Sequence, residues 1–437
     1  MKESFGAKRL GAGSRARLVP ILVFVFSFAQ VHARDTAAGH HPVDDLVFKI
    51  VIYGPYDPIF IWWGHAALIV HNTRWNFSRV FDWGIFSYPS DSFLQDFLLE
   101  RVRYRSAVGG LNMRPYIAED RDIIIYTLNL DRRAKEIMLA YAENSVLPEN
   151  RYYDYHQFLD NCATRIRDII DMGTKGQFRD FFENAPGRLT IRQHVRRFTW
   201  FRPFSEWFLC FMLGQVHDRQ ISAWDEMFLP VEIGRNIVNF SFIDYYGAER
   251  QLVSSVEIYY ASRSRPPILH APIPTWPFFL KGGFIIATLL FQVKAFRKKY
   301  PRSSRIILGL AHSFLGLFFG ILGIVLIFGK FFMNNDYFRQ NFNLLFINPL
   351  FLVIVPLGIF YALDKVSRIN PERCLRIFWN CVLVLCGLTV IIRPLPFFFQ
   401  QNYSVQGLIF PIALALSCIP DNLHRVKPLI DKLIRRD

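Results

Sequence analysis

Cysteine is scarce outside the apolar parts of this chain. Six cysteines occur in 437 residues. Four of them lie in or beside long apolar runs, namely Cys374, Cys381, Cys386 and Cys418. Cys162 and Cys210 belong to the remainder, so the sequence does not predict a disulfide framework. Each of these two cysteines has to be explained by packing or by chemistry.

Signatures of metal and nucleotide binding are absent as well. Ahead of the apolar runs there are no paired cysteines and no His-x-x-x-His spacing, which are patterns of protein zinc sites. His40 and His41 lie beside a predicted cleavage site. No glycine-rich phosphate loop is present. We therefore expect no metal and no other cofactor.

Basic residues exceed acidic ones, and their positions explain why. The formal net charge is +15, from 51 Lys+Arg and 36 Asp+Glu. The basic residues gather in three segments that separate or follow the apolar runs: Arg297, Lys298, Lys299, Arg302 and Arg305; Lys365, Arg368, Arg373 and Arg376; and Arg425, Lys427, Lys432, Arg435 and Arg436. The alternate loops hold Lys330, Arg339 and Arg393. This asymmetry is typical of the cytoplasmic side of a membrane protein, so we expect no nucleic-acid partner.

Long apolar runs dominate the C-terminal part. Five of them lie at about 277–296, 306–329, 344–363, 374–392 and 405–420, after a proline-rich boundary, and the last run is short and contains Pro411. Each is long enough, or nearly so, to cross a bilayer. We predict an all-α five-helix transmembrane domain over 277–420 and a basic cytoplasmic tail over 421–437. Five spans place the C-terminus opposite the exported domain, with every basic loop inside.

The N-terminus has the pattern of an export signal. Basic residues precede a short apolar core at 18–29, and small residues at Val31 and Ala33 suit a signal peptidase. Twelve apolar residues are too few to span a bilayer comfortably. We predict a signal peptide over 1–33 and an exported domain over 34–270. An uncleaved N-terminal anchor is the alternative, and it also exports the domain.

The exported region alternates between strand and helix patterns. Runs at 46–53, 66–70, 80–86 and 122–130 are typical of strands. Helical spacing of apolar residues occurs at 92–104. Asp131 is placed to cap a helix to about residue 145, and Asp160 or Asn161 to cap the next one. The rest, to about residue 268, is expected to be mostly helical, which gives an α+β domain.

Two positions in this domain have the residue types of a nucleophile and its base. His65 follows Gly64 at the start of a predicted strand, and Cys162 begins a predicted helix. A helix N-terminus stabilises a thiolate through its unpaired N–H groups, and an imidazole supplies the base. Taken singly, each residue has a structural alternative, core packing for the cysteine and a turn for the histidine. The sequence does not show whether the two side chains meet.

A third polar group is needed to orient the imidazole. Asp82 is our first candidate because it lies on the strand after His65, and His71 is the second. Tyr53 and Tyr155 are candidates to polarise the site. Cys210 lies in an apolar segment and is expected in the core.

At this point the chain resembles a known family. The order Gly-His on a strand, then Asn-Cys on a helix, resembles the circularly permuted papain-like fold. The strings Gly-His-Ala-Ala-Leu from residue 64, Phe-Asp-Trp-Gly-Ile-Phe from 81 and Asp-Asn-Cys-Ala-Thr-Arg-Ile-Arg-Asp from 160 are similar to the Lnb family of bacterial lipoprotein N-acyltransferases. The resemblance runs from about residue 46 to 420. Two departures are Asp82, where similar sequences often carry asparagine, and a loop at 334–337 without histidine.

The resemblance implies a circularly permuted papain-like exported domain with an activity and a location. Cys162 would be the nucleophile, His65 the general base, and Asp160, Asn161 and Arg165 supporting residues. A phospholipid would donate an acyl chain through a thioester to the N-terminal amine of a diacylated lipoprotein. The protein would lie in the bacterial inner membrane, multi-pass, with its N-terminal domain in the periplasm.

Two other functions fit the same residues. One is a membrane-anchored cysteine hydrolase of the cell envelope, a peptidase or amidase, although five spans exceed what an anchor needs. The other is a catalytically inert membrane scaffold. The aromatic segment 197–212 fits either an interfacial helix or a core helix of the exported domain.

Overall fold

The computed structural model describes residues 41–57, 59–86, 103–333, 336–364 and 370–417. The chain forms two units, residues 1–45 and residues 46–437. Of the first unit only a short 3-10 helix, η1 (Pro42–Asp45), and His41 are described. The predicted signal peptide, the predicted basic tail and most of the predicted helix at 92–104 lie outside the described residues. The last two residues of that predicted helix begin a strand, so helix is wrong for them.

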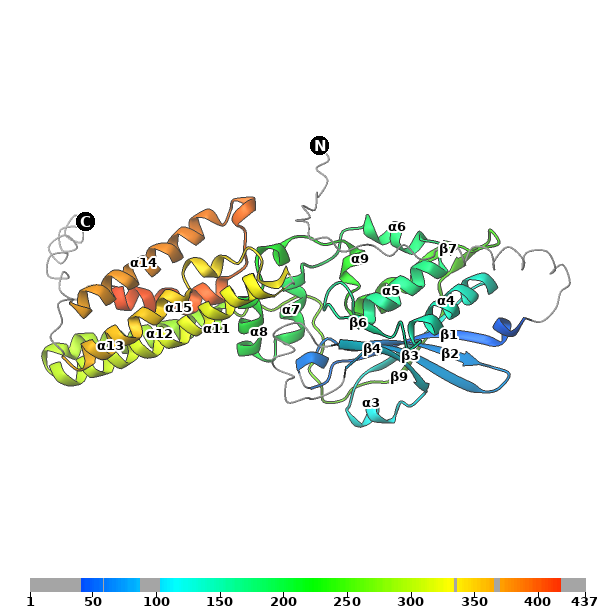
Figure 1. The fold of residues 1–437 in the computed structure, drawn as a ribbon, viewed down its shortest axis with the longest axis horizontal. Helices are drawn as coiled ribbons and strands as arrows, with labels where there is room; N and C mark the ends of the chain where they lie inside the picture. Colours follow the sequence, from blue (N-terminus) through cyan, green and yellow to red (C-terminus); the bar gives the residue numbers. More distant parts are fainter. Residues whose placement is uncertain (1–40, 58, 87–102, 334–335, 365–369, 418–437) are drawn as a thin grey trace, which may run out of the picture. The chain divides into compact units, whose positions relative to one another are not determined.

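One antiparallel sheet organises the first half of the second unit (Figure 1). Its strand order is β6-β4-β3-β2-β1-β5-β9. The strands are β1 (Leu46–Tyr53), β2 (His65–Asn72), β3 (Phe77–Phe86), β4 (Arg103–Gly110), β5 (Ile123–Leu128), β6 (Tyr152–Asp154) and β9 (Val253–Tyr260). The predicted strands at 46–53, 66–70, 80–86 and 122–130 are confirmed as β1, β2, β3 and β5.

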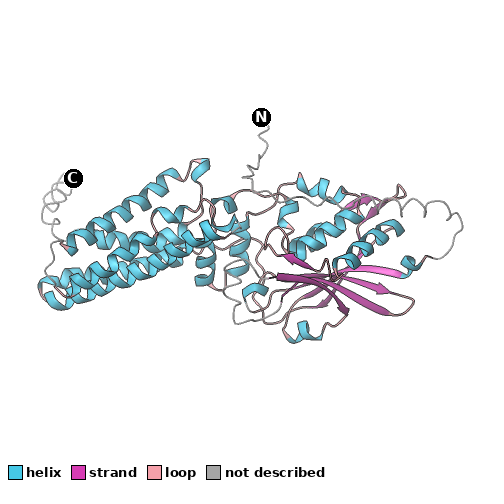
Figure 2. Cartoon of the chain, viewed as in Figure 1, coloured by secondary structure: helices cyan, strands magenta, loops and turns pink. Residues whose placement is uncertain are grey.

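Helices cover both faces of the sheet (Figure 2). On one face lie α4 (Arg132–Ser145) and α5 (Cys162–Gly173), whose apolar residues share a core with inward residues of β1, β2 and β3. On the other face, Met113 and the short α3 (Arg114–Ala118) cover alternate residues of the same strands. Because side chains of a strand alternate between faces, β1 and β2 are apolar on both. This gives the α+β class expected from the sequence.

The stretch expected to be mostly helical is only partly so. It contains α6 (Gln177–Glu183), α7 (Ile191–Thr199), α8 (Pro203–Met212), η3 (Gln215–Asp218), α9 (Ala223–Glu226) and α10 (Pro230–Ile237). It then ends in the hairpin β7 (Ser241–Ile243) and β8 (Glu249–Gln251), followed by β9. The sequence analysis missed β9 because it is an edge strand with largely exposed side chains, so burial does not impose alternation on it.

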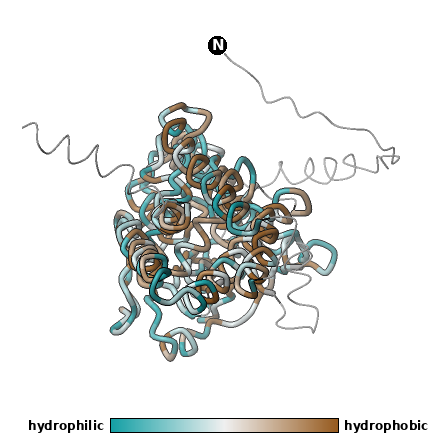
Figure 3. The backbone as a smooth tube through the Cα atoms, turned by 90° about the vertical axis from the view of Figure 1, so that its left-hand side faces the viewer, coloured by the Kyte–Doolittle hydropathy of each residue, from teal (hydrophilic) through white to brown (hydrophobic). Residues whose placement is uncertain are grey.

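Four helical segments of the described residues are long and apolar enough to cross a membrane. They are Trp276–Lys298 (α11, Trp276–Ala295, with η4, Phe296–Lys298), Pro301–Phe332 (α12), Phe342–Ala362 and Pro371–Ile392 (α14). The segment at the fifth predicted run is the shorter apolar helix α15 (Tyr403–Ser417). Figure 3 shows apolar stretches, in brown, along these helices.

The third of these segments is not a continuous α-helix. It consists of η6 (Phe342–Leu345), η7 (Pro349–Val353) and α13 (Ile354–Ala362). Pro349 has no N–H to continue a helix, and the Asn348 side chain accepts a hydrogen bond from the amide of Leu350. Asn348 and Pro349 therefore interrupt the helical structure inside the predicted apolar run, and a new 3-10 helix begins at Pro349.

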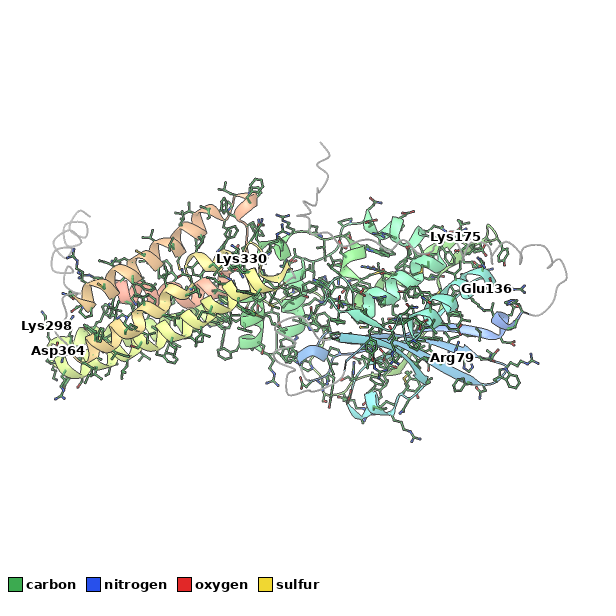
Figure 4. The ribbon with its side chains drawn as sticks, in the orientation of Figure 1. Arg79, Glu136, Lys175, Lys298, Lys330 and Asp364 are labelled. Atoms are coloured by element: carbon green, nitrogen blue, oxygen red, sulfur yellow. The ribbon has the colours of Figure 1, made fainter. Side chains whose placement is uncertain are left out.

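The long helices carry apolar side chains on their outer surface and are joined by polar contacts. Phe314, Val384 and Ile391 are each at least two-thirds exposed, which suits a lipid environment rather than water. His312 accepts a hydrogen bond from the Trp379 indole at 2.9 Å, so it joins α12 to α14. Lys298 and Asp364 lie at one end of these helices and Lys330 at the other (Figure 4).

The helix α8 packs against the apolar helices along one face. Trp207 and Phe211 are buried in the same core as residues of α11 and α15, and the Trp207 indole donates to the carbonyl of Ser404 at 3.3 Å. Phe204 and Phe208, in contrast, are exposed. The aromatic segment thus combines a core face with an exposed apolar face, and neither of the two sequence interpretations describes it alone.

Candidate active site

His65 is placed by the turn between β1 and β2. These two strands pair in antiparallel register so that Tyr53 faces His65 at the end of the ladder. Gly64 has a φ of +81°, and a Cβ on it would lie 2.7 Å from the carbonyl oxygen of Tyr53. Only glycine fits such a conformation and such a close approach. The Gly-His pair is therefore explained by backbone geometry at the end of the sheet.

Asp82 approaches His65 from the next strand. In the β2–β3 ladder Asp82 pairs with Ala67, which places it on the same face as His65. One carboxylate oxygen, Oδ1, lies 2.7 Å from the imidazole Nε2. Both side chains are about one-fifth exposed, at 20% for His65 and 21% for Asp82. This contact fixes the ring orientation and leaves Nδ1 as the nitrogen for a second partner.

Cys162 is the first residue of α5 and lies beside a kink in β3. The β3–β4 ladder shifts register between Asp82 and Ile85, and Gly84 within the shift has a φ of +92°. A Cβ on Gly84 would lie 3.7 Å from the Cβ of Cys162. The bulge thus lets β3 pass close to the start of α5. Cys162 is buried, with 8% of its surface exposed.

The imidazole of His65 interacts with Cys162 as well as with Asp82. Burial by itself would lower the pKa of His65, but the Asp82 carboxylate and the neighbouring Cys162 side chain outweigh it and hold the pKa well above its ordinary value. Both neighbours act through charge and through a side-chain hydrogen bond. A protonated imidazole favours a thiolate next to it. Cys162 thus lies beside this imidazole, at the N-terminus of a helix.

Asn161 caps the helix that carries Cys162. Its side-chain oxygen accepts hydrogen bonds from the amides of Ala163 and Thr164, at 2.8 and 2.9 Å, and the Thr164 hydroxyl accepts from the Asn161 amide at 2.8 Å. Its side-chain amide donates to the carbonyls of Gln157 and Phe228, at 2.6 and 3.0 Å. All polar atoms of the Asn161 side chain are thus used in holding the start of α5.

We expect Asn161→Ala to lower the free energy of unfolding by about 1–2 kcal/mol, since a lost N-cap typically costs that much. Thermal unfolding of the full chain in detergent measures the loss. Asn184→Ala is the matched control, because Asn184 is exposed and its side chain donates to the carbonyl of Asp180; a change within about 0.5 kcal/mol is expected there. Equal losses in both variants would contradict the capping role.

The other flanking residues stabilise the loop before the cysteine. Arg165 donates two hydrogen bonds to the Asp160 carboxylate, at 2.5 and 2.6 Å. Its guanidinium carbon also lies 4.5 Å from the centre of the Tyr153 ring. Burial lowers the pKa of Arg165, but the bonds with Asp160 raise it above its ordinary value. Asp160 and Arg165 are thus paired with each other, one on each side of Cys162.

The two predicted tyrosines lie on opposite sides of the site. The Tyr53 ring stacks against His65, with centroids 6.2 Å apart and planes 14° apart. The Tyr155 ring lies near Gly84, whose Cβ would be 3.6 Å from its Cε2, and it stacks on Tyr104 at 4.0 Å. Burial raises the pKa of both Tyr53 and Tyr155 above the ordinary value of tyrosine. Both phenols therefore stay protonated at neutral pH and are able to donate hydrogen bonds.

Two further residues that sequence reasoning missed contact Tyr53, which itself stacks against His65. The Tyr116 ring stacks on Tyr53 at 3.7 Å. The Arg121 guanidinium carbon lies 5.7 Å from the Tyr53 ring centre and 5.1 Å from that of Tyr116. Arg121 is buried and its Nε donates to the carbonyl of Gly54 at 2.9 Å. No local sequence pattern marks these residues. Tyr116 lies in α3 and Arg121 just before β5, and both reach the site only because of the way the strands pair.

His71 and Cys210, the other histidine and cysteine that we considered, lie elsewhere. His71 pairs with Val47 near the far end of the β1–β2 ladder, and its Nδ1 lies 2.9 Å from the Ser78 hydroxyl. It is therefore remote from His65. Cys210 is buried in α8, and burial raises the pKa of its thiol. A thiol in that setting is a packing residue.

The start of α5 leaves one amide available. The amides of Ala163 and Thr164 bond to the Asn161 side chain, and that of Arg165 bonds to the Asn161 carbonyl. The amide of Cys162 makes no hydrogen bond with the part of the chain that the structure describes. No cluster of three or more His, Cys, Asp or Glu residues suited to a metal occurs among the described residues.

Comparison with known proteins bears on this arrangement. Residues 36–197 match the family model of the Lnb N-terminal periplasmic domain. The matched region contains His65, Asp82 and Cys162, together with the turn and cap that place them. The chain matches no curated protein and no solved structure. The N-terminal domain of this chain is therefore of the Lnb type.

Proposed function

We propose that this protein is a lipoprotein N-acyltransferase that uses Cys162 as its nucleophile. The observation that carries the proposal is His65, held by Asp82 at 2.7 Å and facing Cys162 at the start of α5. This site lies in a domain of the Lnb type that is followed by apolar helices. Such an arrangement suits a substrate that is itself anchored in lipid.

The order of the site elements supports a circularly permuted papain-like fold. The histidine strand β2 precedes the cysteine helix α5 in the chain, whereas the papain-like order is cysteine first. The chemistry depends only on where the side chains meet. We therefore assign the same roles as in other cysteine–histidine sites, with Cys162 as nucleophile, His65 as base and Asp82 as the group that orients His65.

In the first step the Cys162 thiolate attacks the carbonyl carbon of a phospholipid ester. A C–S bond forms, and the C–O bond to the glycerol breaks after a tetrahedral intermediate. The imidazolium of His65 gives its proton to the departing glycerol oxygen, which leaves as lysophospholipid. We assign the Cys162 amide, which makes no hydrogen bond among the described residues, as a donor to the oxyanion. Cys162 then carries the acyl chain as a thioester.

In the second step the N-terminal amine of a diacylated lipoprotein attacks the thioester. A C–N bond forms, the C–S bond breaks, and the amine proton passes to His65. The products are an amide on the lipoprotein and the regenerated thiolate–imidazolium pair. An amine attacks an oxygen ester slowly but a thioester readily. The cysteine therefore divides one slow reaction into two faster ones.

The apolar helices support a location in the bacterial inner membrane, with the N-terminal domain in the periplasm. Four segments are long enough to span. We assign the fifth span to α15, whose 15 residues correspond to about 22 Å of helix. Lys298 and Asp364 then mark the cytoplasmic ends of the helices and Lys330 the periplasmic end (Figure 4).

The thioester is the intermediate that tests this proposal. Full-length protein in detergent is incubated with phospholipid, digested, and its Cys162 peptide is weighed by mass spectrometry. We expect one added acyl mass that hydroxylamine removes and that Cys162→Ala abolishes. A diacylglyceryl-cysteine peptide added next should gain that mass as an amide. Release of free fatty acid without amide formation would identify a hydrolase instead, and no adduct on Cys162 would reject the cysteine mechanism.

A further inference from the structure

The position of Cys162 depends on the turn that precedes it. The amides and carbonyls of His156 and Asp160 exchange two hydrogen bonds of 3.0 Å each. The Nδ1 of His156 accepts further bonds from the amides of Phe158 and Leu159, both at 3.2 Å. Asn161 then ties this turn to α5 through the carbonyl of Gln157. Residues 156–160, which we call the cysteine turn, are therefore rigidly coupled to the first residue of the helix.

A residue of the membrane-helix region contacts the cysteine turn. Tyr337 lies in η5 (Asp336–Phe338), between α12 and the third apolar segment. Its hydroxyl donates a hydrogen bond to the side-chain oxygen of Gln157. Its ring lies 5.4 Å from His156 and meets Phe158 edge-on at 5.2 Å. One side chain from the helical region thus touches three residues of the five-residue turn.

The loop that carries Tyr337 is itself held in place on both sides. The carbonyl of Tyr337 accepts from the amide of Gly214 at 2.7 Å, and the side chain of Asn341 donates to the carbonyls of Phe211 and Met212, at 2.8 and 3.0 Å. Phe338 is buried against Gly329 of α12, where a Cβ would lie 2.4 Å from its ring. Movement of α12 against α8 would therefore move Tyr337.

We propose that Tyr337 is a positioning residue of the Cys162 site, supplied by the loop between the membrane helices. The cysteine is fully reactive only while α12 and its following loop hold the cysteine turn in place. This inference rests on the proposed cysteine chemistry but not on the identity of the acyl acceptor. It explains how a lipid-anchored domain confines thiol reactivity to the assembled membrane form of the protein.

The test measures thiol reactivity, which needs no acyl substrate. Full-length wild type, Tyr337→Phe, Tyr337→Ala and Gln157→Ala are alkylated with iodoacetamide in detergent at pH 5 to 9, and labelling of the Cys162 peptide is followed by mass spectrometry. Tyr337→Phe loses one hydrogen bond and should react about fivefold more slowly at neutral pH. Tyr337→Ala also loses the ring contacts and should react more slowly still. The double variant Tyr337→Phe/Gln157→Ala should be no slower than the slower single variant.

Tyr246→Phe is the matched control, since Tyr246 is 69% exposed on the exported domain, and its rate should stay within about twofold of wild type. In acyl transfer, kcat should fall in the Tyr337 variants while KM for the phospholipid stays constant. Wild-type labelling rates and pH profiles in both Tyr337 variants would overturn the inference. If labelling responds to Tyr337 but no acyl thioester ever forms, the positioning role stands and the proposed function fails.

Discussion

Replacing His65 by alanine is expected to slow acylation of Cys162 by about a thousandfold or more, because general acid–base catalysis by one group contributes typically 10²–10⁴-fold. The variant loses three things at once. It loses the positive charge that favours the thiolate, the acid that protonates the departing glycerol oxygen, and the base that takes the amine proton. The measurement is the single-turnover rate of acyl adduct formation on the Cys162 peptide, in full-length protein with phospholipid.

A second histidine on the same strand supplies the control. His71 lies near the opposite end of β2 and contacts the Ser78 hydroxyl. His71→Ala should therefore change the rate by less than about twofold. Both variants remove one imidazole from β2, so an effect on folding of the sheet would appear in both. Similar rates for the two variants would mean that His65 is not the base.

The residues of the site could be chosen from the sequence because each has a local signal. Gly64 before His65 marks a predicted strand start, and Asn161 before Cys162 predicts a capped helix. The structure shows the strand and the cap, and adds the positive φ of Gly64. Capping also decided between Asp160 and Asn161, since Asn161 bonds the first helical amides while Asp160 pairs with Arg165. Local chemistry of this kind can be recognised without knowing the fold.

What brings the residues together is not local. Asp82 reaches His65 because the β2–β3 register pairs it with Ala67, and a single-residue slip would turn it to the other face of the sheet. Gly84 approaches Cys162 only because β3 shifts register there. Tyr116 and Arg121 reach Tyr53 across the sheet. None of these contacts follows from spacing along the chain, because register is fixed by the packing of both faces.

The helical region shows the same difference between local signals, which the sequence reveals, and non-local contacts, which it does not. Apolar length alone predicted helical segments at all five runs, four of which are long and apolar enough to span a membrane, and the basic loops indicated their direction. The break at Asn348 and Pro349 could have been suspected from the proline, but the contacts that position the loop before it could not. Tyr337 lies 175 residues after Cys162, and its partners are determined by how α8 packs on α11 and α15. A role for this residue becomes visible only in three dimensions.

Asp82→Asn is expected to narrow, on its alkaline side, the pH range over which phospholipid acylates Cys162. Asp82 is the strongest influence that raises the pKa of His65, whereas burial lowers it. With an uncharged amide the hydrogen bond to Nε2 is kept but the charge is lost, so the pKa of His65 falls. The imidazolium, which gives its proton to the departing glycerol oxygen, is then lost at a lower pH. Above that limb the acylation rate falls about tenfold for each pH unit by which the limb moves.

The same pKa shift makes stability depend on pH in a defined direction. Because His65 has a higher pKa in the folded chain than in the unfolded one, its contribution is fully present below the unfolded value, about 6.5, and is lost as the pH rises through the folded value. Asp82→Asn should thus remove stability mainly at neutral and lower pH. Acylation of Cys162 by phospholipid and thermal unfolding of the full chain, both followed from pH 5 to 10, measure the two effects. Glu143→Gln is the control, because it removes a carboxylate that pairs with Arg79 on the surface. An alkaline limb in Asp82→Asn that coincides with those of wild type and the control would show that the Asp82 charge does not hold His65 protonated.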